Sequence, residues 1–397
     1  MTEAGPIFLP KGFKFSSATA GIKASGKPDL ALIVADRPTS AAALFTKNLI
    51  VAAPVEVGRS SLAKSYGNVR AVIVNSGNAN CATGPAGIRA CKKVCSELAQ
   101  LLNIRPTEVF PSSTGIIGVP LPVEKINSQL KSLLEKSGAS LDHFRQFANA
   151  ILTTDTRLKL ASIPLRNGKA AVTGVAKGSG MIQPQLATML VYILTDVIAT
   201  PTELRRVLRK ACGETFNVIS IDGDTSTNDT VLLLTSGATG VRVRSVQKEF
   251  EKAVLRVCQS LAEQIVADGE GVQHVVHLRV EQAKNRTEAV QVARTIAHSL
   301  LVKTAWAGAD PNWGRILAAI GRSGVRVNPK RVTIFIGAQK VCSASTTCVF
   351  DEKAAHEELS KAESRVTVQL GRGRARLDFL TTDLTADYVR INADYST

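Results

Sequence analysis

Hydrophobic and polar residues follow two patterns along the chain, which together predict a mixture of strands and helices. Short apolar runs rich in β-branched residues are typical of buried strands, and apolar residues three and four positions apart are typical of helices with one buried face. The first pattern predicts strands at 29–36, 50–57, 70–75, 107–110, 158–165, 170–176, 188–195, 216–221, 230–235 and 272–282. The second predicts helices at 85–102, 122–135, 141–152, 201–212, 246–266, 286–300, 312–321 and 352–363. Residues 331–397 are expected to alternate short strands with that last helix alone.

One predicted strand follows directly on a loop that cannot form regular structure. The loop is Lys177-Gly-Ser-Gly-Met-Ile-Gln-Pro-Gln-Leu-Ala187, whose glycines and proline permit tight backbone turns. The strand starts at Thr188 and continues through β-branched and aromatic residues to Thr195. Taken alone, Thr188 is explained by strand propensity. Any other role for it must be argued from the rest of the chain.

Length and composition indicate a globular protein. At 397 residues, the chain can form two or three domains, or one large sandwich with an appended unit. Its 45% hydrophobic and 21% charged residues are not the composition of a disordered chain. No apolar run reaches the roughly 18 residues of a membrane span, and the first residues lack the basic and apolar regions of a signal peptide. We therefore expect no membrane partner and a cytoplasmic location.

The formal net charge of +16 makes nucleic acid a partner to consider. However, Lys and Arg are spread through the sequence, aromatic residues make up only 5%, and no helix-turn-helix or RNA-recognition signature occurs. A solvated basic surface, or one that attracts small anions, is therefore favoured, and no nucleic-acid partner is expected.

The cysteine and histidine residues are not spaced as metal ligands. Seven cysteines are scattered without a CxxC pair, and the five histidines are dispersed. The acidic run 222–229 resembles a calcium loop in composition, but it lacks the glutamate at the twelfth position and precedes a predicted strand. We expect no metal site.

Six short motifs occur in order along the chain. They are Ser113-Thr-Gly-Ile-Ile-Gly118, Thr153-Thr-Asp-Thr156, Lys177-Gly-Ser-Gly-Met181 with Ala187-Thr-Met-Leu190, Asp222-Gly-Asp-Thr-Ser-Thr-Asn-Asp229, Asp310-Pro-Asn-Trp-Gly-Arg315 and Tyr388-Val-Arg-Ile-Asn-Ala-Asp394. Together they closely resemble the ornithine acetyltransferase family of arginine biosynthesis, from near residue 10 to the C-terminus. Each motif is weak evidence by itself, but six in register are highly specific.

The resemblance implies an α+β protein whose 1–283 domain is an α/β/β/α sandwich like that of the DmpA-type aminopeptidases. This domain would carry the active site, and 284–397 would form a smaller C-terminal α/β domain. The family cleaves its own chain, here between Ala187 and Thr188, into an α chain (1–187) and a β chain (188–397), which assemble as an α2β2 heterotetramer. It transfers acetyl from N2-acetylornithine to glutamate without a cofactor. Many members also acetylate glutamate from acetyl-CoA, which is therefore a candidate co-substrate.

The same resemblance assigns the site residues. Thr188 would be the nucleophile, and the hydroxyl of Thr114 and the backbone N–H of Gly115 would form the oxyanion hole. Substrate contacts are implied for Thr154, Lys177, Thr188, Glu270, Asn392 and Thr397.

Elementary chemistry agrees with an N-terminal threonine as nucleophile. A threonine hydroxyl needs a base to take its proton, and the α-amino group that cleavage would free lies on the same residue. With a pKa of about 7.7–8.0, a fraction of about a tenth of that amine is neutral near pH 7 and can act as the base, so no histidine is required. Attack on an acetyl carbonyl creates an oxyanion that needs prearranged donors. We further hypothesise that Lys177 pairs with a substrate carboxylate and Glu270 with the ornithine ammonium.

Two alternatives remain open at this point. An aminopeptidase or amidase on the same sandwich would use Thr188 in the same way but pass the acyl group to water. A basic protein that binds nucleic acid would have no use for cleavage at residue 187. Acetylglutamate formation and the appearance of two chains on a denaturing gel separate these alternatives from the transferase.

Overall fold

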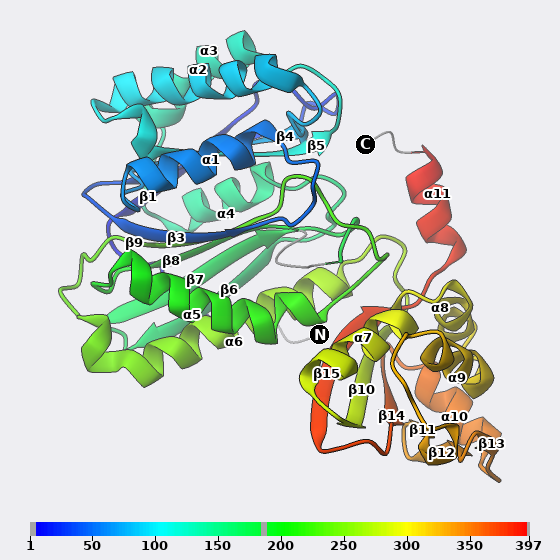
Figure 1. Cartoon of the computed structure of the whole chain (residues 1–397). Helices are drawn as coiled ribbons and strands as arrows, with labels where there is room; N and C mark the ends of the chain where they lie inside the picture. The colour runs from blue at the N-terminus through cyan, green and yellow to red at the C-terminus, as the bar shows by residue number, and fades with distance from the viewer. Residues whose placement is uncertain (1–4, 184–188, 395–397) are drawn as a thin grey trace.

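Two β-sheets lie face to face and are covered on their outer sides by helices (Figure 1). This computed structural model describes residues 5–183 and 189–394. The first sheet has the order β1 (Phe13–Ala18), β2 (Leu30–Ala35), β4 (Ala71–Asn78), β5 (Val109–Ile116). The second has the order β3 (Ser40–Phe45), β9 (Thr230–Thr235), β8 (Leu190–Thr195), β7 (Ala170–Lys177), β6 (Lys159–Leu165).

Each outer face of the pair is covered by two amphipathic helices. The first sheet packs against α2 (Gly84–Leu102) and α3 (Val123–Glu135), and the second against α5 (Pro201–Glu214) and α6 (Gln247–Ala267). Helices α1 (Ala53–Lys64) and α4 (Leu141–Ala150) contact strands of the first sheet, and short 3-10 helices occur at Pro106–Glu108, Phe216–Val218 and Val243–Val246. The α+β class and the α/β/β/α sandwich are thus confirmed.

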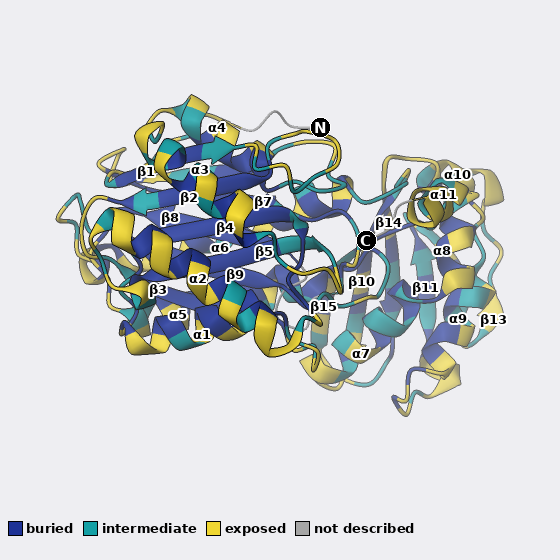
Figure 2. Cartoon of the chain, turned by 90° about the horizontal axis from the view of Figure 1, so that it is seen from above, coloured by how far each residue is buried: buried dark blue, intermediate teal, exposed yellow. Residues whose placement is uncertain are grey.

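Aromatic side chains fill part of the space between the two sheets. Phe15 of β1 contacts Phe144 and Phe147 of α4 at ring-centroid distances of 5.0 and 6.2 Å. Phe147 in turn meets Tyr192 of β8 at 5.7 Å. All four side chains are buried, and the strands of the sandwich form a continuous buried layer in Figure 2. Because β8 is buried on both faces, its sequence is a continuous apolar run instead of an alternating one.

A third sheet forms the C-terminal unit. Its strand order is β13 (Thr346–Thr347), β12 (Gln339–Ser343), β11 (Thr333–Ile336), β14 (Glu363–Gln369), β10 (Val275–Ala283), β15 (Ala375–Thr382). It packs with α7 (Arg286–Ala297), α8 (Leu300–Ala307), α9 (Trp313–Gly321) and α10 (Glu352–Leu359), and a 3-10 helix spans Pro329–Arg331. Strand β10 pairs with β14 on one side and β15 on the other. The domain boundary expected at 283/284 is therefore wrong by one strand, because β10 belongs to this sheet.

A last helix, α11 (Ala386–Asp394), leaves β15 and extends back toward the sandwich (Figure 1). The sequence pattern predicted no helix here. None of its residues is buried, so it lacks the one-sided apolar face that makes a helix visible in a sequence. None of the helices built from the described residues is long and apolar enough to cross a membrane.

Four other predictions of secondary structure were wrong. Residues 53–57 begin α1 and not a strand, because Pro54 occupies its first turn, where a proline is tolerated. The strand expected at 216–221 is a 3-10 turn at Phe216–Val218. The strand expected to break at Pro111 continues to Ile116, because β5 is an edge strand and can accommodate a proline. The predicted helix at 286–300 is divided into α7 and α8.

Candidate active site

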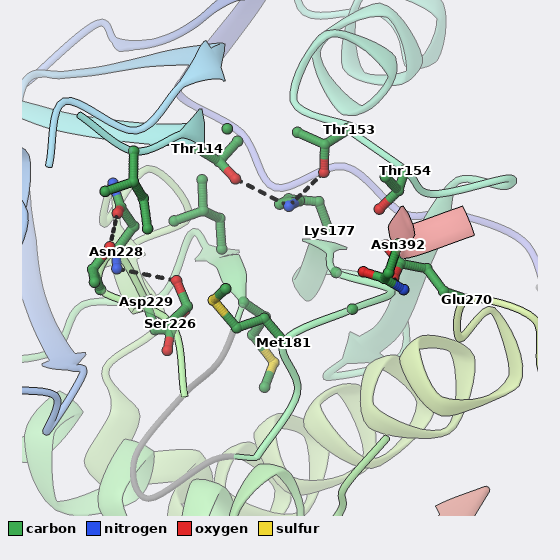
Figure 3. Close-up of a pocket in the computed structure, with 17 residues that line it drawn as sticks. Thr114, Thr153, Thr154, Lys177, Met181, Ser226, Asn228, Asp229, Glu270 and Asn392 are labelled. Atoms are coloured by element: carbon green, nitrogen blue, oxygen red, sulfur yellow. Dashed lines mark hydrogen bonds between the residues drawn. The ribbon is translucent and has the colours of Figure 1, made fainter. Parts of the chain in front are cut away.

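A cavity of about 120 Å³ lies where the ends of β5, β7 and β8 meet the loops that follow α4 and α6. Figure 3 shows side chains from β5, β7 and the two loops, among them Thr114, Thr153, Lys177 and Glu270, turned toward it. Its lining consists of Thr114, Gly115, Ile117, Thr153, Thr154, Lys177, Gly178, Gly180, Met181, Met189, Leu190, Ser226, Thr227, Asn228, Asp229, Glu270 and Asn392.

Gly115 is placed in the cavity wall by an unusually close approach of two backbones. Strands β4 and β5 are parallel, and their register is irregular where Gly77 faces Gly115. Gly115 has φ +129°, and a Cβ at this position would lie 2.3 Å from the carbonyl carbon of Gly77. Only glycine fits such a backbone and such a contact. The peptide units around Thr114 and Gly115 are thereby fixed at the edge of the cavity.

Lys177, the last residue of β7, connects two threonines across the cavity (Figure 3). Its Nζ donates hydrogen bonds to Thr114 Oγ1 at 3.1 Å and to Thr153 Oγ1 at 2.9 Å. Burial lowers the pKa of Lys177, and the nearby Asp155 carboxylate opposes that shift. An ammonium group has three donors and no acceptor. Thr114 Oγ1 must therefore accept from the Lys177 ammonium, which leaves the Thr114 proton free to be donated elsewhere.

A buried ion network holds the loop after α4 in place. Asp155 accepts from Lys159 Nζ at 2.6 Å and from the backbone N–H of Gly178 at 2.6 Å. Lys159 also contacts Asp268 at 2.5 Å, and the Thr156 N–H donates to the same carboxylate at 3.1 Å. Burial disfavours ionisation of Asp155, but Lys177, Lys159 and the two hydrogen bonds bring its pKa below the ordinary value. These paired charges fix the backbone next to Lys177, through Gly178, and next to Thr153, through Asp155 and Thr156.

Glu270 and Asn392 meet at one end of the cavity, although 122 positions separate them. Asn392 of α11 donates from Nδ2 to Glu270 Oε2 at 2.8 Å. The backbone N–H of Glu270 donates to the carbonyl oxygen of Ser179 at 2.9 Å. A Cβ at Gly180 would lie 2.4 Å from Glu270 Oε2, so a larger residue there would displace this carboxylate from its observed position. Thr154 lies nearby, and its hydroxyl shares a hydrogen bond of 2.7 Å with Ser179 Oγ.

The opposite end is closed by the segment before β9. Asn228 Nδ2 donates to the carbonyl oxygens of Ala79 (2.6 Å) and Ser113 (2.9 Å), which ties this segment to the end of the first sheet. The side chain of Asp229 is buried beside it. Burial raises the pKa of Asp229 well above its ordinary value.

The structure brings together six of the residues that the family resemblance assigned. Thr114, Gly115, Thr154, Lys177, Glu270 and Asn392 all line this one cavity. Ala187, Thr188 and Thr397 lie outside the described residues. Met189, which follows Thr188 in the sequence, is part of the cavity wall.

Several polar residues of this site had no role predicted from the sequence, among them Thr153, Ser179 and Asp229. All three lie in motifs that carried the family resemblance, so their position within these motifs was a signal that they belong to the site. Their contribution depends on contacts with Lys177, Thr154 and Met189, which sequence spacing does not reveal. The residues 222–229, which resembled a calcium loop, contribute Asp229 to the cavity, and Asp222 accepts backbone hydrogen bonds from Met181 and Ile182. Among the described residues no group of three or more His, Cys, Asp or Glu side chains could hold a metal ion.

Comparison with known proteins places the chain in a family. The sequence model of the ArgJ family matches residues 14–397. The arginine biosynthesis bifunctional protein ArgJ of Chlorobaculum tepidum is 42% identical over 393 residues, covering 98% of this chain and 96% of that protein. The protein of the same name from Thermus thermophilus is 44% identical over 392 residues, covering 98% and 100%. The crystal structure of the Bacillus halodurans ArgJ protein shares 40% identity over 51% of this chain and 98% of that chain, with a TM-score of 0.49. The resemblance found in the six motifs is confirmed, and the chain belongs to the ArgJ family.

Proposed function

We propose that this chain transfers the acetyl group of N2-acetyl-L-ornithine to L-glutamate through an acetyl-Thr188 intermediate. Membership of the ArgJ family supports this function, as does the name shared by its curated relatives. The observation that carries it is the single cavity that gathers Thr114, Gly115, Lys177, Glu270 and Asn392 from distant parts of the chain.

In the proposed mechanism, self-cleavage between Ala187 and Thr188 frees the α-amino group of Thr188. That amine takes the hydroxyl proton as Thr188 Oγ1 attacks the acetyl carbonyl. The Thr114 hydroxyl, whose oxygen already accepts from Lys177, donates its proton toward the oxyanion, together with the Gly115 N–H. Ornithine then leaves, and the amine of glutamate attacks the acetyl ester.

Charge at the cavity supports the choice of substrates. The Lys177 ammonium has two of its three donors engaged by threonines, so one donor is left for a substrate carboxylate. Glu270 accepts a hydrogen bond from the neutral Asn392, so its carboxylate is available to a substrate ammonium. An amino acid that carries both charges is thus complementary to the cavity. We therefore retain the assignment of Lys177 to the carboxylate and Glu270 to the ammonium as part of the proposal.

We propose acetyl-CoA as a second donor, in keeping with the bifunctional name of the relatives, and no bound cofactor. We also propose that two cleaved copies assemble as an α2β2 heterotetramer in the cytoplasm. The seven free cysteines fit a reducing compartment. Native mass spectrometry of the purified protein would then give twice the 42.2 kDa of one chain.

Acetylglutamate formation tests the function directly. Purified protein is supplied with glutamate and either N2-acetylornithine or acetyl-CoA, and acetylglutamate is measured for each donor. We expect product from both donors, and none from Thr188→Ala, which should also run as one uncut chain on a denaturing gel. Acetate without acetylglutamate would instead support the amidase alternative.

A further inference from the structure

Asp229 is held beside the chain segment that follows the proposed nucleophile. It immediately precedes β9, and β9 pairs in parallel with β8 so that Thr230 faces Leu190. The Thr230 N–H donates to the carbonyl oxygen of Met189 at 3.0 Å, and the Thr46 N–H donates to the carbonyl oxygen of Asp229 at 3.0 Å. The backbone of Asp229 is thus fixed from two sides, next to Met189.

The carboxyl group of Asp229 lies in the cavity wall but is not fully paired. The residue is only 2% exposed, and it lines the cavity with Ser226 (Figure 3). Met189 is also part of this lining. Its Oδ2 has no hydrogen-bond partner among the described residues. Leaving a buried polar atom unpaired destabilises the folded protein. Such an atom needs an explanation, and a role in the reaction is one.

Two other aspartates show what a structural carboxylate looks like in this protein. Asp29 accepts backbone hydrogen bonds from Ala20, Ile22 and Lys23 at 2.6, 2.5 and 3.0 Å. Asp155 accepts from Lys159 and Gly178, and its pKa is lowered. Asp229 differs from both, because one of its carboxyl oxygens, Oδ2, has no hydrogen-bond partner among the described residues.

The charges around Asp229 favour a group that can change its protonation state. Burial raises its pKa, whereas the Ser226 hydroxyl, the Lys177 ammonium and the Met189 N–H oppose the rise. Lys177 is the charged side chain that acts on Asp229, and it is itself influenced by Asp155, Lys159 and Glu270. A buried carboxyl beside a cation can serve as acid in one step and as base in another.

We propose that Asp229 is the acid–base catalyst for the nitrogen atoms of the donor and acceptor amino acids. This inference rests on the acetyl transfer proposed above. In the first half-reaction the C–N bond of the acetamide breaks, and the Asp229 carboxyl gives its proton to the departing ornithine amine. In the second half-reaction the Asp229 carboxylate takes one proton from the glutamate ammonium, so that the neutral amine can attack the acetyl ester. When the ester breaks, the Thr188 ammonium returns to Oγ1 the proton that it took in the first half-reaction. The second proton of the glutamate ammonium passes to water, and the released ornithine amine takes one from water, so the cycle balances.

The leaving group of the donor provides the test. An amine departs only after protonation, whereas p-nitrophenolate departs as an anion. With Asp229→Asn we expect acylation by N2-acetylornithine to fall at least about 100-fold, the usual contribution of general acid–base catalysis. The burst of p-nitrophenolate from p-nitrophenyl acetate should fall less than about tenfold. A misfolded or distorted site would lower the rates of acylation by N2-acetylornithine and by p-nitrophenyl acetate equally. Equal losses with the two donors would overturn the proposal.

Two further variants complete the experiment. Asp224→Asn removes an exposed carboxylate of the same loop and should behave as wild type with both donors. Asp229→Glu keeps a carboxyl group at this position. It provides the test if Asp229→Asn fails to cleave its own chain between Ala187 and Thr188. It should retain more acetylornithine activity than Asp229→Asn and shift the pH dependence of kcat/KM for that donor alone. A pH dependence identical to that of wild type would contradict the assignment. Transferase activity of the wild-type protein tests the proposed function separately. The proposed function and the role of Asp229 can therefore fail independently.

Discussion

At the residue scale, the candidate site depends on a lysine that orients a threonine. Lys177 can only donate, so the proton of Thr114 is directed away from it and toward the cavity. The oxyanion donor would thus be positioned before substrate arrives, which is the arrangement that electrostatic catalysis requires. Lys177 would then affect the rate of the chemical step as well as substrate binding.

A double-mutant cycle tests this coupling. We expect Lys177→Met and Thr114→Val each to lower kcat for acetyl transfer by about 100-fold, the effect of losing one oxyanion donor. The double variant should be little worse than either single variant, because both remove the same oriented proton. Thr153→Val, which removes the other partner of Lys177, should cost less than about tenfold. Additive losses in the double variant would show that Lys177 and Thr114 act independently.

Gly115 and Gly118 allow backbone strain to be separated from steric exclusion. Both have positive φ, but a Cβ would collide with Gly77 only at Gly115 and would meet nothing at Gly118. Gly118→Ala should therefore cost about 1 kcal/mol of unfolding free energy, and Gly115→Ala clearly more, with loss of activity. Urea unfolding of the two variants measures the difference. Equal destabilisation would mean that the close approach of β4 and β5 relaxes easily.

At the scale of single elements, the sequence predicted those with a strong apolar pattern and missed those defined by tertiary contacts. Strands β2, β6, β7 and β9 and helices α2, α3 and α6 lie where periodicity placed them. Strands β1 and β3 were not predicted, and α1 was taken for a strand because its apolar residues do not follow a clear helical spacing. Helix α11 buries none of its residues, so no hydrophobic pattern could reveal it. The resemblance nevertheless identified Asn392 within it.

Helix α11 contributes to the site through one hydrogen bond. Asn392→Leu removes an exposed hydrogen-bond donor to Glu270 from the cavity wall, where the substrate ammonium is proposed to bind. We expect the KM for N2-acetylornithine to rise about tenfold or more, while the melting temperature stays close to that of wild type because the helix is exposed. Steady-state kinetics and thermal unfolding check the two parts. An unchanged KM would exclude α11 from the substrate site.

The segment that leads toward β8 is anchored by a carboxyl group with a raised pKa. Asp222 accepts from the backbone N–H groups of Met181 and Ile182, and burial raises its pKa to about 6. Because the folded protein binds this proton more tightly than the unfolded chain, the contribution of Asp222 to stability is full below about pH 4 and decreases as the pH rises through 6. Asp222→Asn does not titrate. Its unfolding free energy relative to wild type should therefore increase between pH 4 and pH 7, and a difference independent of pH would contradict this reasoning.

At the scale of the whole molecule, the site is assembled from both units of the chain. The sandwich supplies the ends of β5 and β7, and the C-terminal unit supplies Asn392 through α11. Individual residues of the site were identifiable from the sequence only because six motifs occurred in register. Neither periodicity nor composition relates Thr114 to Lys177 or Glu270 to Asn392, since these pairs are 63 and 122 positions apart and meet only after folding. The same limit explains why Asp229 and Thr153 went unassigned.

The most direct test of the central claim is the mass of the chain that starts at Thr188. The purified protein is incubated with N2-acetylornithine alone, denatured and examined by intact-mass and peptide mass spectrometry, and glutamate is then added to a second portion. We expect one acetyl group on the peptide that begins with Thr188, and we expect it to disappear as acetylglutamate forms. A chain that remains uncut, or a cut chain that forms acetylglutamate without acetylation of that peptide, would contradict it.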